Sequence, residues 1–333
     1  MSYDEEYFKS EEFHELLDSY EAAVADGNYP FMDADDLIDI ADYYNMSDCH
    51  DKAVEVVDHA LQLYPNATLP NVFMAREALQ DGDFERAHQH LAAIEDKDDP
   101  DYHYLKAELL VAEEHIEQAD CYLRDYGLTV PADEYEDFVR DCANLYVDYG
   151  VSEKAYEWML RSKGDNSIDF KELMARTLFG LGKYPEAQKL FNELIDADPY
   201  NSIYWNALAS AQFLNEQYSD AIASSEYALA INPKDSEALA IKGSGMIQLG
   251  NIEEAVKYLR RYAEIIPDDY PFMAACCFEL GYPEEFLYYL KIACEYDPEG
   301  TRLSLGRLFP EDMEVEDYYP FMLEEIKNQE ISK

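Results

Sequence analysis

The sequence predicts an all-α protein in which helical hairpins stack into an α-solenoid, and three observations support this prediction. Pro199, Pro233 and Pro267 follow one another at a constant stride of 34 residues, and Pro65 lies close to the same phase, 134 residues before Pro199. An alanine stands 12 residues before each of these prolines. Between the prolines, apolar residues follow helical spacing. A repeat of this length that ends in a helix-stopping residue is typical of stacked helical pairs.

The clearest repeat unit is residues 202–235. Trp205 and Leu208 share one face of an expected first helix, residues 215–218 form a turn, and Pro233 ends an expected second helix. Two antiparallel helices that pack closely need small residues where their axes approach. In this unit and its two neighbours the residues expected at that approach are Ala175, Ala187, Ala209, Ala221, Gly243 and Ala255.

This pattern resembles the tetratricopeptide repeat family, whose W-x2-L-G-x2-Y…A-x3-F…P signature is followed well in residues 168–269. The same phase continues, with weaker matches, in 34–67, 68–101, 100–133, 136–169 and 270–298, for a total of about eight units. Asp99 and Ser167 take the proline position, and Phe286 takes the position of the small alanine. The resemblance implies a right-handed superhelix whose first helices line a concave groove.

Three regions follow from the phase of the repeat. Residues 1–33 contain an amphipathic helix expected to cap the array, 34–298 form the array, and 299–333 form a C-terminal cap with an acidic tail. The ends of such an array need more polar outer faces than its interior. The tetrapeptide Tyr-Pro-Phe-Met occurs at 29–32, 270–273 and 319–322, and each copy is expected to pack at the start of a helix.

The charge is strongly and unevenly acidic. Asp and Glu number 72 against 25 Lys and Arg, a formal net charge of -47. The first 150 residues carry -31 of it. Direct nucleic-acid binding, which needs clustered basic residues, is therefore not expected. Anionic membrane surfaces are disfavoured for the same reason. A basic protein partner would be attracted.

No catalytic or cofactor motif is found. Gly180–Tyr184 reads as a hairpin turn because it lacks the spacing of a phosphate-binding loop, and no HExxH or GxSxG sequence occurs. His88 and His90 lie two apart on a helix and point to different faces, so no metal site is expected. The sequence therefore predicts a protein that is not an enzyme and has no cofactor.

The six cysteines form no CxxC pair, and most of them suit small core positions, which favours a reducing compartment. The acidic N-terminal decapeptide lacks the apolar stretch of a signal peptide, and no run of about 18 apolar residues is present. We therefore expect a cytoplasmic protein. Nothing in the sequence specifies an oligomeric state.

The leading functional prediction is a protein–protein interaction scaffold that binds a peptide or helix in the groove. Mapping the units onto the family pattern places polar donors and aromatic anchors inward. The residues expected there are Arg76, Tyr104, Arg140, Asn144, Arg176, Phe179, Asn206 and Phe213. Pairing of Arg176 with Glu172, four residues earlier, is the structural alternative for that arginine. The alternative function is an acidic, chaperone-like or nucleic-acid-mimicking binder of a basic protein through the N-terminal half.

Overall fold

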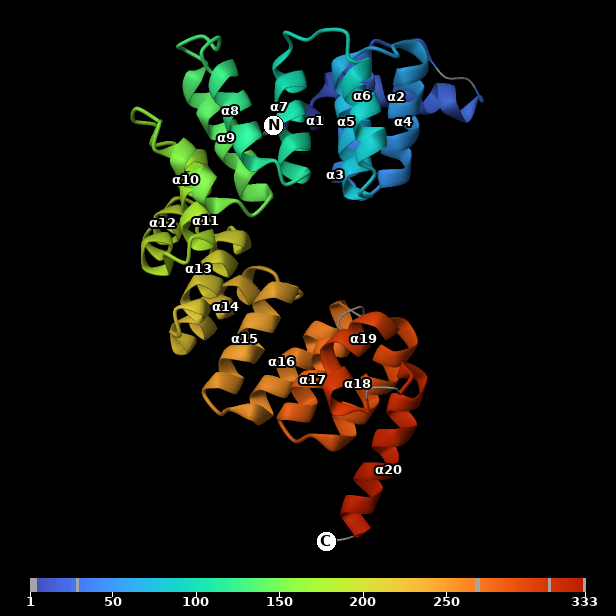
Figure 1. Ribbon diagram of the computed structural model, residues 1–333, viewed down its shortest axis with the longest axis vertical. Coiled ribbons are helices and arrows are strands. Elements are labelled where there is room, and N and C mark those ends of the chain that lie inside the picture. The colour runs from blue at the N-terminus through green and yellow to red at the C-terminus, as the bar shows by residue number, and fades with distance from the viewer. Residues whose placement is uncertain (1–4, 28–29, 267–269, 311–312, 332–333) are drawn as a thin grey trace. The chain divides into compact units, whose positions relative to one another are not determined.

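The structure is a computed structural model, and it describes residues 5–27, 30–266, 270–310 and 313–331. Every regular element within these ranges is helical, as Figure 1 shows, which confirms the predicted all-α class. The chain divides into two compact units, Met1–Asp165 and Asn166–Lys333, here called unit 1 and unit 2. The boundary lies inside the array predicted for 34–298, two residues before Ser167, which takes a proline position of the repeat.

Unit 1 consists of a helical cap followed by four helical hairpins. The cap is α1 (Glu5–Phe8) and α2 (Glu11–Ala25). The hairpins are α3 (Ala34–Met46) with α4 (His50–Leu63), α5 (Thr68–Gln80) with α6 (Phe84–Ala93), α7 (Pro100–Ala112) with α8 (Ile116–Tyr126), and α9 (Tyr135–Asp148) with α10 (Ser152–Met159).

Unit 2 begins with four more hairpins and ends in a C-terminal cap. The hairpins are α11 (Ile168–Gly180) with α12 (Tyr184–Ala197), α13 (Ser202–Leu214) with α14 (Tyr218–Ile231), α15 (Ser236–Gln248) with α16 (Ile252–Ile265), and α17 (Tyr270–Glu279) with α18 (Pro283–Tyr296). The cap is α19 (Pro298–Leu305), the 3-10 turns η2 (Gly306–Leu308) and η3 (Val315–Asp317), and α20 (Tyr318–Ile331). The described residues thus form eight hairpins, in agreement with the repeat phase.

Helix ends follow the residues that the repeat places there. Helices α12 and α14 end two residues before Pro199 and Pro233, whereas Pro267 lies outside the described residues. Where the proline is replaced, the substitute caps the next helix instead. The side chain of Asp99 accepts from Asp101 N at 2.9 Å at the start of α7, and that of Ser167 accepts from Phe170 N at 3.1 Å at the start of α11.

All eight hairpins turn through one residue in the left-handed backbone region. In five of them it is a glycine, such as Gly182 (φ 70°). In the other three it is Asp48, Glu114 or Glu216, with φ between 55° and 62°. Left-handed backbone costs a residue with a side chain about 1–2 kcal/mol, so packing of the two helices on either side imposes these three turns.

The small residues expected at the helix–helix approach are buried there. Ala175, Ala187, Ala209 and Ala221 have no exposed surface. In the eighth hairpin Phe286 occupies this position and is 1% exposed, with its ring centroid 5.2 Å from that of Phe278. The bulkier residue is accommodated in a core that also takes side chains from the C-terminal cap.

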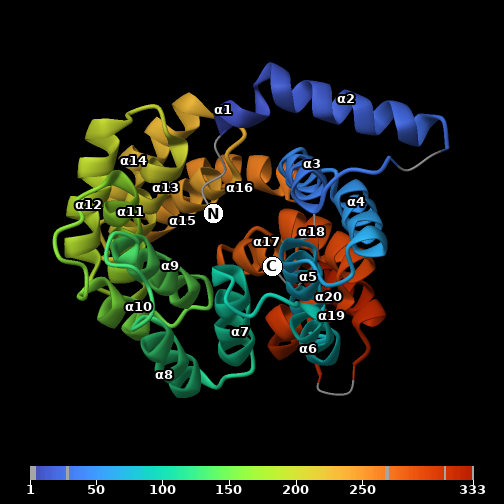
Figure 2. The same ribbon diagram turned by 90° about the horizontal axis from the view of Figure 1, so that it is seen from above.

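Both caps cover the apolar side of a terminal hairpin. Figure 2 shows α2 beside α3 and α4, and its Phe13, Leu17 and Tyr20 are buried in the same cluster as residues of those two helices. At the other end, Leu305 and Tyr318 join the core of α17 and α18. These contacts bury apolar faces that the first and last hairpins would otherwise expose to water.

The three Tyr-Pro-Phe-Met segments do not share one role. The segment at 270–273 starts α17, and the segment at 319–322 lies in the first turn of α20, as expected. For 29–32 the expectation is wrong, because α3 begins only at Ala34; Tyr29 lies outside the described residues. Here the backbone is held against α4: the carbonyl of Pro30 hydrogen-bonds His59 Nε2 at 2.9 Å, and Tyr64 OH donates to the Met32 carbonyl at 3.0 Å.

Candidate protein-interaction surface

The eight residues predicted to line a groove lie on the first helices of their hairpins, as expected from the repeat phase. They divide equally between the two units. Arg76, Tyr104, Arg140 and Asn144 lie on α5, α7 and α9 of unit 1, and Arg176, Phe179, Asn206 and Phe213 lie on α11 and α13 of unit 2.

In unit 1 the predicted donors are bound to carboxylates of the same chain. Arg76 Nε donates to Glu108 Oε2 on α7 at 2.9 Å. Arg140 Nη1 donates to Asp165 at 2.8 Å, and its Nη2 bonds Asp137. Asn144 Nδ2 donates to Asp148 at 2.9 Å. The Arg76 contact joins α5 to α7, the other contacts lie within α9 or reach the segment after α10, and all of these donors are directed to internal acids.

Tyr104 lies in an aromatic cluster between hairpins of unit 1. Its ring centroid is 6.3 Å from that of Phe138, which in turn meets Trp158 edge-on at 5.5 Å. Burial, followed by the charge of Asp141, raises the pKa of Tyr104 far above its usual value. The phenol is therefore a half-buried, neutral group with a hydrogen bond to Asp141.

Unit 2 uses the same kind of contact between neighbouring first helices. Asn206 is 5% exposed and donates from Nδ2 to both carboxylate oxygens of Asp235, each at 2.9 Å. Asp235 also caps α15 by accepting from Ala238 N at 3.0 Å. Tyr204 OH donates to Glu172 at 2.9 Å. Glu172 thus accepts a hydrogen bond from the next hairpin.

The two predicted aromatic anchors lie near the hairpin turns. Phe179 and Phe213 are half-buried, and each meets the tyrosine that starts its second helix edge-on, at 5.7 Å from Tyr184 and 5.4 Å from Tyr218. Each ring therefore closes its own hairpin and still presents part of its surface to solvent.

Apolar side chains remain exposed on one face of α13. Ile203 is 68% exposed and Leu214 is 49% exposed. Residues 11 positions apart on a helix project in nearly the same direction, and Ser210 lies between them on that side. We call this surface, made of Ile203, Ser210, Phe213 and Leu214, the α13 face. Its one polar side chain is already used, since Ser210 Oγ donates to Glu237 at 3.1 Å.

Sequence reasoning missed the acids that receive the predicted donors. The donor and its acid in these contacts are separated by 32 residues for Arg76 and Glu108, and by 29 for Asn206 and Asp235. A separation close to the repeat length is the sequence signal that was available. It indicates that first helices of successive hairpins carry matched donors and acceptors.

Within the described ranges, no group of three or more His, Cys, Asp and Glu side chains is arranged to hold a metal ion. The described helices include none that is both long and apolar enough to cross a membrane. None of the six cysteines, all of which lie in the described ranges, forms a disulfide; Cys142 and Cys277 are buried and Cys121 is exposed.

The fold places the chain among proteins built from stacked helical hairpins. Sequence comparison then identifies the kind of hairpin repeat. Residues 173–236 and 212–277 match two family models, each described as tetratricopeptide repeat. The chain therefore contains tetratricopeptide repeats, which the two matches place within residues 173–277. Proteins of this kind generally bind other proteins or peptides.

Curated relatives match only part of the chain. RNA polymerase II-associated protein 3 of Homo sapiens is 33% identical over 92 residues, which is 28% of this chain and 14% of that protein. A TPR repeat-containing protein of Methanocaldococcus jannaschii is 33% identical over 129 residues, covering 37% and 22%. The chain thus matches less than a quarter of the length of either relative.

Solved structures give similar partial overlays. A tetratricopeptide repeat protein from Parabacteroides merdae overlays with a TM-score of 0.48 and 15% identity, over 70% of this chain and 93% of that one. YrrB, described as a TPR protein with an unusual peptide-binding site, gives a TM-score of 0.37 and 14% identity over 65% and 94%.

Proposed function

We propose that this chain is a protein-interaction scaffold. The apolar side chains of its α13 face bind a helix or extended segment of a partner protein, and basic residues of the partner flank that segment. The observation that carries the proposal is the exposure of Ile203 and Leu214 on a first helix of a tetratricopeptide repeat. Exposed apolar side chains grouped on one face are typical of binding surfaces.

The partner's flanking charge follows from the internal pairing of donors. Arg76, Arg140 and Asn206, predicted to receive a carboxylate, already bind acids of this chain. The excess of acid over base then leaves basic groups as the complementary partners. A partner segment that ends in a free carboxylate would therefore find fewer available side-chain donors on this chain than the sequence predicts.

The test uses the full chain and two synthetic helical peptides. Both carry leucines at i, i+4 and i+7, one with lysine and arginine flanks and the other with glutamate flanks, and binding is followed by fluorescence anisotropy. We expect binding of the basic peptide, with the Ile203→Ser/Leu214→Ser variant at least about tenfold weaker because the anchors' apolar contacts are lost. Leu128→Ser is the matched control, since Leu128 is 86% exposed in unit 1. Unchanged affinity in the double variant would refute the α13 face.

A second candidate function is supported by the charge of unit 1. Residues 1–165 contain 42 acidic and 11 basic residues, a net charge of -31, against -16 for 166–333. We propose that unit 1 also attracts basic proteins electrostatically. Binding of this kind weakens steeply with salt, whereas apolar anchoring is far less sensitive.

Neutralising exposed acids in each unit separates this candidate from the first. Glu15→Gln/Asp18→Asn/Glu95→Gln removes three charges from unit 1, and Glu186→Gln/Asp196→Asn/Glu295→Gln removes three from unit 2. We expect the first set to weaken binding of a polylysine probe more than the second at low salt. An equal effect of the two sets would contradict a role specific to unit 1.

A further inference from the structure

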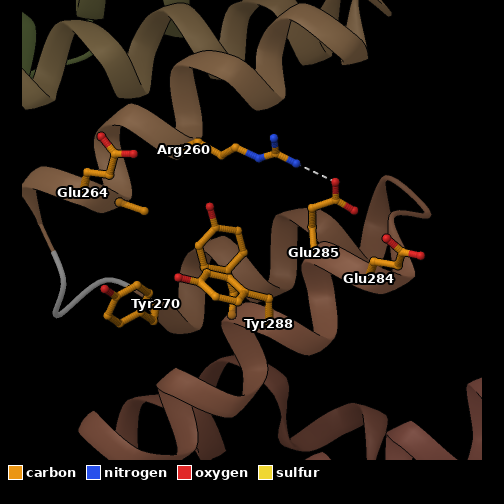
Figure 3. A pocket seen from close by; sticks show the side chains of 8 residues that line it. Arg260, Glu264, Tyr270, Glu284, Glu285 and Tyr288 are labelled. Atoms are coloured by element: carbon orange, nitrogen blue, oxygen red, sulfur yellow. Dashed lines mark hydrogen bonds and ion pairs between the residues drawn. The ribbon is translucent and has the colours of Figure 1, made fainter.

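A cavity of about 390 Å³ lies between α16, α17 and α18 of unit 2. Three tyrosines and three glutamates line it, and we call it the tyrosine–glutamate pocket: Tyr270, Tyr288, Tyr289, Glu264, Glu284 and Glu285. Its volume is at the small end of the usual range for ligand sites. Figure 3 shows Arg260, Glu285 and Tyr288 near the middle of the lining, with Glu264 and Glu284 toward its two ends.

The aromatic rings of the pocket present faces in different directions. Tyr288 meets Tyr289 nearly perpendicularly, with ring centroids 5.1 Å apart, and Tyr270 lies roughly parallel to Tyr289 at 6.2 Å. Tyr289 is 5% exposed and belongs to the core, whereas Tyr288 is 63% exposed at the rim. An aromatic ring left this open beside carboxylates has a negative face available to a cation.

The carboxylates of the pocket exceed its basic groups. Arg260 is the basic residue in the lining, and its Nη2 binds Glu285 at 2.6 Å, as the dashed line in Figure 3 marks. Glu264 and Glu284 are exposed, and no ion pair joins either to a basic side chain of the described residues. The lining therefore carries two carboxylates beyond the one that Arg260 neutralises.

We propose that the tyrosine–glutamate pocket binds an arginine side chain of a partner protein. A guanidinium is flat, so it can stack on the Tyr288 ring while its in-plane N–H groups meet Glu284 or Glu264. A lysine ammonium is a compact, strongly hydrated charge that gains less from an open ring. The Arg260–Glu285 pair already places one guanidinium–carboxylate contact at the wall of the pocket.

This inference deepens the proposed function and rests on it, because it supplies one of the basic positions of the partner segment. The pocket lies on α16, α17 and α18, away from the α13 helix that carries the apolar anchors. Pocket and α13 face can therefore be altered separately.

The test compares capped pentapeptides Gly-Gly-X-Gly-Gly with X as arginine, lysine or citrulline, titrated into the full chain by NMR. We expect arginine to bind at least about fivefold more tightly than lysine, and citrulline, which has the same shape without charge, to bind weakest. Equal binding of arginine and citrulline, or of arginine and lysine, would overturn the proposal. So would the absence of any arginine-dependent shift.

Single-residue variants test whether the arginine pentapeptide binds at the tyrosine–glutamate pocket. Tyr288→Ala and Glu284→Gln change exposed side chains and should each weaken arginine binding about fivefold or more. Tyr296→Ala and Glu295→Gln are the matched controls; Tyr296 is 70% exposed and neighbours Tyr270 without lining the pocket. Circular dichroism and thermal melting verify folding. Arginine binding that survives Tyr288→Ala unchanged would refute this site.

The amphipathic peptide of the preceding test separates the two proposals. If it binds through the α13 face and the arginine pentapeptide does not bind, the pocket assignment fails and the scaffold function stands. If the pentapeptide binds and the amphipathic peptide does not, the α13 proposal fails while the pocket is retained as an arginine site.

Discussion

Asp120 on α8 is a carboxylate buried to 2% exposure that three donors share. Trp158 Nε1 donates at 3.1 Å, Arg124 Nη2 at 3.0 Å and Lys154 Nζ at 3.4 Å. Two of these donors come from α10, so the one carboxylate joins the second helices of two successive hairpins. Its loss would leave the indole N–H of Trp158 buried without an acceptor.

We predict that Asp120→Ala lowers the free energy of unfolding by about 2–4 kcal/mol, because the buried indole N–H loses its acceptor and two cations lose their buried carboxylate. Urea unfolding followed by tryptophan fluorescence measures this change. The control is Glu117→Ala, whose side chain is 78% exposed and contacts the same Lys154 at 3.0 Å. Exposed pairs contribute about 0–1 kcal/mol, so comparable losses in the two variants would contradict the role of Asp120.

Residue-level prediction from the sequence placed side chains on the correct helices but not with the correct partners. The repeat phase put Arg76 and Asn206 on first helices. It could not show that Glu108 and Asp235 receive them, because that pairing depends on the offset between successive hairpins. The same limit applies to the tyrosine–glutamate pocket, whose residues come from three helices and follow no short motif.

At the scale of the element, Gly243 shows why the first and second helices of a hairpin need small residues. A Cβ built on Gly243 would lie 2.7 Å from two side-chain atoms of Leu259 on α16, closer than real Cβ atoms come. Leu259 itself is 1% exposed and cannot swing into solvent. Close packing of α15 on α16 therefore depends on the missing side chain.

We predict that Gly243→Ala destabilises the protein by about 1–2 kcal/mol, although alanine is the better helix former, because overpacking costs more than the propensity gained. Leu259→Val should cost about 0.5–1.5 kcal/mol alone. In the double variant the two effects should be less than additive, since the smaller valine relieves the clash. Ser244→Ala is the control, with a change within about 0.5 kcal/mol. Full additivity in urea unfolding would show that the two side chains do not compete for space.

Most helices could be predicted from the sequence, because the repeated prolines mark helix ends and the repeated alanines mark the positions where two helices pack. A left-handed turn residue could be predicted only in the hairpins where that residue is a glycine. Asp48, Glu114 and Glu216 adopt the same left-handed conformation, and no residue preference marks them in advance. The helix start expected at 29–32 was wrong because hydrogen bonds to α4 hold residues 30–32 in another conformation.

At the scale of the whole molecule, the excess of acid makes stability depend on pH. Burial raises the pKa of Asp39, and burial together with Asp99 raises that of Asp101. The folded chain then binds more protons than the unfolded chain between the ordinary carboxyl range of about 4 and neutrality, so stability rises as pH falls through that window. Burial lowers the pKa of His90 and His103, which acts in the opposite sense below about pH 6.5.

We predict that protonation of the buried carboxyls and the reduced repulsion from a net charge of -47 outweigh the opposing effect of the two histidines. The melting temperature should therefore be higher at about pH 5.5 than at pH 7.5. Thermal unfolding by circular dichroism measures it. Asp39→Asn should raise stability at pH 7.5 and flatten the pH dependence, because the amide carries no charge to desolvate. Asp18→Asn, an exposed position on α2, is the control. A lower melting temperature at pH 5.5 would mean that the two histidines dominate.

The contacts between first helices also bear on how such a chain can change its number of repeats. Deleting residues 202–235 would preserve the 34-residue phase, yet it would remove Tyr204, the donor to Glu172, together with both members of the Asn206–Asp235 pair. Duplicating the same segment would place Tyr204 of the new copy opposite Asn206 of the old one instead of Glu172. Gain or loss of a whole repeat therefore requires compensating substitutions of the donor and acceptor residues at the new junction. The order of the hairpins matters to this fold as much as their number.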